Sequence, residues 1–193
     1  PKYLNDNNSV LDVSALEGYP NGSYAKGAPG NAGGGGTDGN PADNNDENTG
    51  GGGGANGGPG GNGGNSWSSD IACGGKAGSV FSQASPSRLV MGGGGGAGTT
   101  NNATGSPANG FASSGSTGGG IIILVANNTI NGTGTIKANG ANANSTVKND
   151  GSGGAGAGGS IMIFSKNGTL SSIVATAKGG NGGNNQLTTI DPH

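Results

Sequence analysis

The acidic side chains gather in one short polar stretch, and their spacing could bind a cation. Asp43, Asp46 and Glu47 stand among asparagines in the sequence DNNDENT. Carboxylate and amide oxygens are the ligands that Ca²⁺ prefers. The spacing matches neither an EF-hand loop nor the glycine–aspartate repeats that bind calcium. We therefore interpret the stretch as a solvated loop and expect no bound cofactor, with a calcium site at these three residues as the alternative.

The residues needed for catalysis are scarce. His193 is the one histidine and Cys73 the one cysteine of the chain, so a nucleophile would lack an activating base. The G-x-G patterns at 132–134 and 154–156 neither open a helix nor carry the lysine of a phosphate-binding loop. We therefore predict no enzyme, with no catalytic and no cofactor-binding residues, and we expect Cys73 to fill a small apolar gap.

Aromatic side chains offer a second kind of site. Trp67, Tyr19, Tyr24 and Phe111 could be contact platforms for a ligand such as a surface glycan, since aromatic residues dominate contact sites. In a chain with 28% hydrophobic residues, the same side chains are needed as filling between backbone segments. We expect them in the core, with a carbohydrate- or receptor-binding tip as the alternative function.

Charge and hydropathy exclude two classes of partner. The formal net charge is −2, and eight lysine and arginine residues are spread along the chain without a basic cluster. No patch could therefore neutralise the phosphates of a nucleic acid. No stretch approaches the roughly 20 apolar residues that span a bilayer as a helix. We expect neither a nucleic-acid partner nor a membrane span.

Glycine spacing dominates the chain and must set its backbone. Glycine accounts for 49 of the 193 residues. In two stretches it recurs at every third position, which is neither the period of an α-helix nor that of a strand. It is the period of a left-handed extended helix with three residues per turn, here called polyglycine II. The expected structural glycines are Gly27, Gly30, Gly33, Gly36 and Gly39, and then Gly51, Gly54, Gly57, Gly60 and Gly63.

A single extended helix has no internal hydrogen bonds, so it needs neighbours. Without a Cβ atom, glycine segments can approach closely and pair their N–H and C=O groups across a bundle. Short apolar stretches, IIILVA at 121–126 and IMIF at 161–164, predict strands that pack as a sheet against this bundle. The expected fold is mainly β and irregular, with essentially no α-helix. It combines a polyglycine-II helix bundle with a β-sandwich or β-helix-like framework.

The last third of the chain contains an internal repeat. Residues 118–144 resemble residues 157–184 after a shift of about 39 positions, which indicates stacked supersecondary units. The Asn-Gly pairs in NGTGTIKANG predict hairpin turns. We expect one glycine-rich module over 1–193. It has an N-terminal strand region at 1–26, glycine helices with polar loops at 27–117 and the twofold strand–glycine repeat at 118–193.

Three sequence blocks resemble a known class of protein. SRLVMGGGGGAG at 87–98, GGGIIILVANNTINGTGTIKANG at 118–140 and GSGGAGAGGSIMIF at 151–164 are similar to the glycine-rich repeat regions of large bacterial surface proteins. Many of those proteins are cyanobacterial and described as adhesin-like. The pattern also resembles polyglycine-II domains of phage tail-tip adhesins, of certain receptor tyrosine kinases and of springtail antifreeze proteins.

The resemblance implies a function that does not involve catalysis. It favours an extracellular, cell-surface module that is structural or adhesive and that assembles into fibres or with neighbouring modules. It further implies that the chain is one part of a longer polypeptide or assembly. Binding to ice is the weakest alternative, because an ice-binding face needs a regular array of small residues, whereas these stretches carry Asn, Pro and Asp irregularly.

Overall fold

The computed structural model describes residues 31–37, 47–66, 71–100, 105–147, 150–168 and 171–185. Its regular elements are the short 3₁₀ helix η1 (Phe111–Ser113) and the strands β1 (Ile121–Ala126), β2 (Asn131–Lys137), β3 (Ser160–Ser165) and β4 (Ser171–Thr176). No α-helix occurs among these residues, so none could cross a bilayer. The expectation of a mainly β and irregular chain is confirmed, while the strand expected within 1–26 lies outside the described residues.

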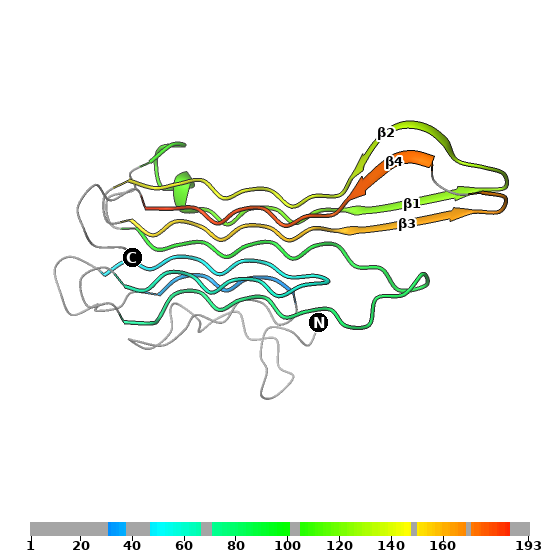
Figure 1. Cartoon of the computed structure of the whole chain (residues 1–193). Helices are drawn as coiled ribbons and strands as arrows, with labels where there is room; N and C mark the ends of the chain where they lie inside the picture. Colours follow the sequence, from blue (N-terminus) through cyan, green and yellow to red (C-terminus); the bar gives the residue numbers. More distant parts are fainter. Residues whose placement is uncertain are drawn as a thin grey trace.

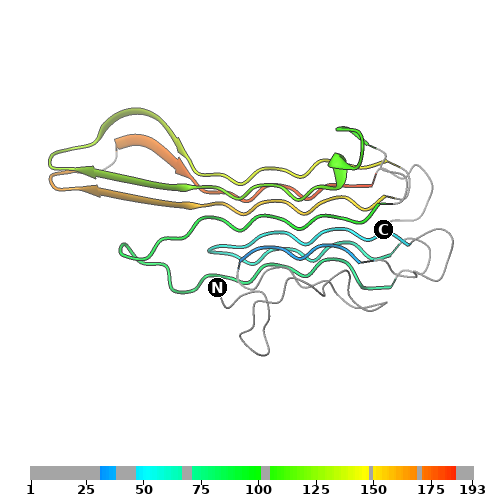
Figure 2. The same ribbon diagram turned by 180° about the vertical axis from the view of Figure 1, so that it is seen from behind.

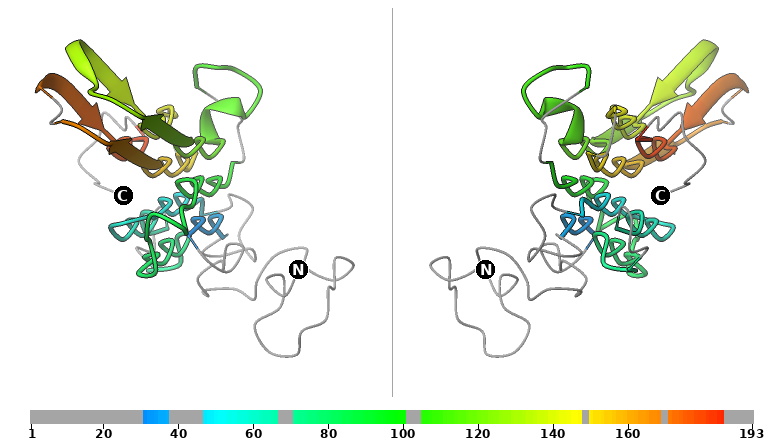
Figure 3. Two further views of the ribbon diagram at one scale, coloured as in Figure 1. Left: turned by 90° about the vertical axis from the view of Figure 1, so that its right-hand side faces the viewer. Right: turned by 90° about the vertical axis from the view of Figure 1, so that its left-hand side faces the viewer.

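Extended glycine-rich segments make up most of the rest and run side by side along one axis (Figure 1). Seen end-on, each segment winds tightly about its own axis (Figure 3). We number them in chain order: I (31–37), II (47–56), III (58–66), IV (71–81), V (88–100), VI (113–120), VII (138–147), VIII (150–159) and IX (177–185).

Backbone hydrogen bonds join these segments with a three-residue repeat. In segment II every amide from residue 50 to residue 56 donates, and successive donors turn to different neighbours. Gly51 N–H and Gly54 N–H both donate to segment VIII, at Ser152 O and Ala155 O, with N···O distances of 2.9 Å each. The amides of residues 50, 53 and 56 donate to segment III. Residues three apart in segment II therefore share a neighbour.

The close approach leaves no room for side chains at most of the expected structural glycines. A Cβ atom built on Gly54 would lie 1.9 Å from Gly93 O, and one on Gly51 would lie 2.0 Å from Gly96 O. Gly57 differs, because a Cβ there would meet nothing within 4 Å. The corresponding nearest distances are 2.0 Å at Gly33, 2.5 Å at Gly36, 2.0 Å at Gly60 and 2.0 Å at Gly63, whereas Gly27, Gly30 and Gly39 lie outside the described residues.

The strands pair between the two repeat units and not within them. β1 pairs with β3 in parallel and β2 pairs with β4 in parallel, with Ile122 opposite Ile161 and Thr135 opposite Val174. The expected hairpin pairing within each unit is therefore wrong. The reason is the repeat itself, because equivalent strands lie side by side at an offset of 39 residues and take up one another's hydrogen bonds.

The strands also continue the glycine segments end to end instead of packing across the bundle. Segment VI leads into β1, β2 leads into segment VII, and the second unit repeats this course (Figures 1 and 2). The β2–β4 pair arches away from the β1–β3 pair at the far end of the molecule (Figure 1). The expectation of a sheet laid against the bundle is thus wrong, since one chain path serves both structures.

The buried side chains are small, and larger apolar ones stay at the surface. Among the described residues the most buried hydrophobic residues are Ala55, Cys73 and Ala112, each 0% exposed. Phe111 is 63% exposed, so its expected core position is wrong. The packing of backbone against backbone leaves space for a methyl or thiol group but none for an aromatic ring. Trp67, Tyr19 and Tyr24 lie outside the described residues.

Candidate functional site

The expected calcium ligands can be placed only in part. Asp43 and Asp46 lie outside the described residues, whereas Glu47 begins segment II and is 5% exposed. Within the described ranges, no group of three or more His, Cys, Asp or Glu side chains is arranged to hold a metal ion. The calcium site at Asp43, Asp46 and Glu47 therefore stays a prediction.

Buried hydroxyl groups at one end of the bundle join segments together. Thr37 N–H donates to Thr49 Oγ1 at 2.7 Å, and Thr37 Oγ1 donates to Cys73 O at 2.5 Å. Thr49 N–H donates to Thr99 Oγ1 at 2.8 Å. Each of these bonds occupies a backbone group where the glycine ladder ends. The threonines therefore act as caps, and one of them donates to the backbone of Cys73, which is itself buried.

A second hydroxyl cluster ties segments VII and VIII together. Thr146 Oγ1 donates to Asp150 O at 2.7 Å and lies 2.9 Å from Ser152 Oγ. All three residues are buried. These hydroxyls bond to backbone and to one another, and no histidine, lysine or arginine takes part in the bonds described. The cluster has the composition of a structural link and lacks the base that would activate a nucleophile.

Side-chain oxygens also stack the second repeat unit on the first. Asn139 Oδ1 accepts from Lys178 N–H at 2.9 Å, and Asn142 Oδ1 accepts from Asn181 N–H at 2.8 Å. Both pairs span 39 residues and lie three residues apart along each segment. Sequence reasoning found the repeat but missed this asparagine ladder. The three-residue spacing of Asn139 and Asn142 was the signal that could have revealed it.

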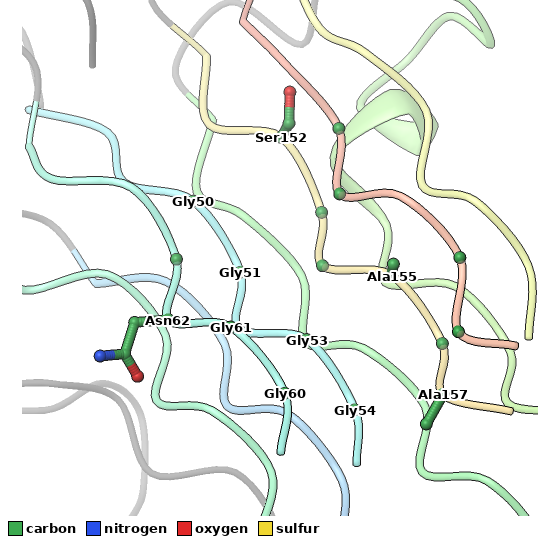
Figure 4. Close-up of a pocket in the computed structure, with 18 of the residues that line it drawn as sticks. Gly50, Gly51, Gly53, Gly54, Gly60, Gly61, Asn62, Ser152, Ala155 and Ala157 are labelled. Carbon is green, nitrogen blue, oxygen red and sulfur yellow. The ribbon is translucent and has the colours of Figure 1, made fainter. Parts of the chain in front are cut away.

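A groove runs along segments II and VIII. Its volume is about 670 Å³, and segments II, III, VIII and IX line it. Figure 4 shows Gly51, Gly53 and Gly54 of segment II beside Ser152, Ala155 and Ala157 of segment VIII, with Gly60 and Gly61 of segment III alongside. Most of the lining residues are glycines, several others are asparagines, and none is aromatic. Asp150 is its one acidic or basic residue among those described.

Comparison with known proteins gives no match: no family model, no curated protein and no solved structure is significantly similar to this chain. The features of the molecule that bear on its function are the groove, the hydrogen-bond register and the exposed strands.

Proposed function

We propose that the chain is an extracellular structural or adhesive module without catalytic activity, built on a polyglycine-II bundle that is continuous with a β-framework. The observation that carries the proposal is the hydrogen-bond register of segment II. Each turn of a three-residue helix presents its N–H and C=O groups in different directions around the axis. Segment II bonds to segments I, III, IV, V and VIII, which is the connectivity of a segment inside such a bundle.

The arrangement suits a mechanical role because its stability is spread over many backbone bonds. A single hydrogen bond contributes only about 1 kcal/mol net, and ordering glycine backbone is entropically costly. Many parallel bonds between segments distant in sequence are therefore needed, and the described residues supply them. A protease needs an extended stretch released from such contacts, so we expect the bundle to resist cleavage.

The strands support the proposed assembly with neighbouring modules or further copies. Within the described residues, each strand pairs with one partner only, so the outer edges of the β1–β3 and β2–β4 pairs keep unpaired backbone groups. Val125 and Phe164, opposite each other in the β1–β3 pair, are 65% and 56% exposed. An edge with exposed apolar side chains is the kind of surface that pairs with another chain.

Protease treatment of intact cells of the native source tests the proposal. We expect fragments of this chain to be released from the cell surface, with the glycine segments recovered as long uncut pieces by mass spectrometry. The physical reason is that local opening of an interior segment requires breaking bonds to several neighbours together. Recovery of the chain only after lysis would contradict the extracellular location. Short peptides from within residues 50–56 would contradict the rigid bundle.

A further inference from the structure

The groove is a position beside segment II that no described segment occupies. Around segment II, successive neighbours are bonded to each other in the order III, IV, I, V and VIII. Representative bonds are Gly60 N–H to Gly78 O, Gly34 N–H to Lys76 O, Gly33 N–H to Gly94 O and Gly154 N–H to Gly96 O. No bond joins III to VIII among the described residues, and the groove lies between them. Three donors and three acceptors per turn give a helix up to six neighbours, and the described part of the chain supplies five of them to segment II.

Segment VIII lacks the same neighbour. It bonds to segments II, V, VI, VII and IX, and these are bonded to each other in the order II, V, VI, VII and IX. The bond from Ala141 N–H to Thr117 O joins VII to VI, and that from Ala143 N–H to Asn181 O joins VII to IX. The ring around segment VIII is therefore open between IX and II. The groove bordered by II, III, VIII and IX is the vacant position for both segments.

The floor of the groove carries the backbone groups that such a neighbour would use. Gly51 O and Gly54 O accept no hydrogen bond from a described residue, although the other carbonyls of residues 49–56 do. Ser152 N–H and Ala155 N–H donate none, although both residues are buried, at 7% and 8% exposed. The two carbonyls of segment II lie three residues apart, and so do the two amides of segment VIII; Gly158 N–H, which also donates none, continues that series, and Gly153 N–H is a further amide without a bond. Groups three residues apart point in the same direction from a three-residue helix. Every other direction around segments II and VIII already holds a bonded neighbour, so these groups face the groove.

We propose that this groove binds an extended, glycine-rich segment of another polypeptide. The bound segment donates N–H groups to Gly51 O and Gly54 O and accepts from Ser152 N–H and Ala155 N–H, which completes both rings of neighbours. Glycine is required wherever the bound segment faces a neighbouring backbone closely, because such contacts leave no room for a Cβ atom, as at Gly54. A lining without aromatic rings and with one acidic residue favours an uncharged peptide over a sugar, which would stack on aromatic rings.

The inference rests on the proposed bundle, and two positions allow it to be tested without disturbing that bundle. Gly61 and Gly182 line the groove, and a Cβ atom on either would meet nothing within 4 Å. A larger side chain there fills the groove while leaving existing contacts intact. Gly120 is the matched control, because its Cβ would also meet nothing within 4 Å and it does not line the groove.

Titration of the isotope-labelled full chain with a synthetic Gly-Gly-Asn repeat peptide of about ten residues, roughly 31 Å when extended, tests the proposal. We expect saturable shifts and slowed exchange of the Ser152 and Ala155 amides. Gly61→Leu and Gly182→Leu should each weaken binding about tenfold or more, a change of one decade in the dissociation constant, and Gly120→Leu should not. A peptide with alanine in place of glycine should not bind.

Three results would overturn the groove proposal. The first is no shift at Ser152 and Ala155 while the amides of residues 50–56 stay protected; this result leaves the bundle intact. The second is equal binding of the alanine peptide. The third is a change in the chemical shifts of these two amides as the protein concentration rises, which added peptide does not reverse. That result would make a second copy of this chain the occupant of the groove. Loss of protection over residues 50–56 would instead count against the proposed function.

Discussion

Gly54→Ala is expected to destabilise the protein by about 3 kcal/mol, at the upper end of the usual cost of overpacking. The added methyl group would lie 1.9 Å from Gly93 O and 2.5 Å from Gly93 C. Backbone atoms cannot move aside as a flexible side chain can. Gly93 is itself held by its N–H bond to Ala55 O at 3.0 Å. Relief therefore requires segments II and V to separate and to lose their mutual hydrogen bonds.

Gly57→Ala is the matched control in the same glycine series. A Cβ at Gly57 meets nothing within 4 Å, so we expect no loss and a gain of up to about 1 kcal/mol from the stiffer unfolded chain. Urea denaturation of both variants measures the difference in the free energy of unfolding. Similar effects of the two substitutions would show that the close backbone packing does not hold in solution.

Asn56→Ala is expected to cost about 2 kcal/mol, the typical penalty for leaving buried polar groups without partners. Asn56 is 7% exposed, and its Nδ2 donates to Gly158 O at 3.0 Å and to Gly159 O at 2.9 Å. Neither carbonyl accepts another hydrogen bond from a described residue. The side chain thus joins the first half of the chain to the second repeat unit across about a hundred residues of sequence.

Asn62→Ala provides the comparison for that loss. Asn62 is exposed, and its Oδ1 accepts one hydrogen bond, from Ala77 N–H at 2.9 Å. Water can replace an exposed acceptor, so we expect a cost below about 1 kcal/mol. The same denaturation measurement checks both asparagine variants. A larger loss for Asn62→Ala than for Asn56→Ala would contradict the role given to the buried amide.

Local chemistry explains what could be predicted from the sequence. Glycine at every third position, as at Gly51 and Gly54, states directly which face of a segment must lack a Cβ atom. The 39-residue shift between the two strand units likewise predicts stacking, and the structure pairs Ile122 with Ile161 at that offset. Both features are periodic in the sequence, so they can be predicted without knowing which segments become neighbours.

Neighbour choice explains what could not be predicted. Glycine segments have no side chains to distinguish one partner from another, so the sequence does not say that segment II meets segment VIII. The groove forms only because segments II and VIII are neighbours, and no sequence motif marks the residues that line it. The hairpin prediction failed because Asn-Gly chemistry specifies a reversal of direction, while parallel pairing with the equivalent strand supplies the hydrogen bonds. The core position expected for Phe111 failed because no gap between backbones accommodates a ring.

Residue-resolved amide exchange of the intact protein tests the three-residue bundle most directly. The account predicts slow exchange at every amide from residue 50 to residue 56, because each of them donates to a neighbouring segment. In segment III only every third amide should be slow: Gly60 and Gly63 donate to segment IV, while the amides of Gly61, Asn62 and Gly64 have no acceptor among the described residues. Slow exchange at every second amide, or fast exchange throughout residues 50–56, would contradict the three-residue bundle.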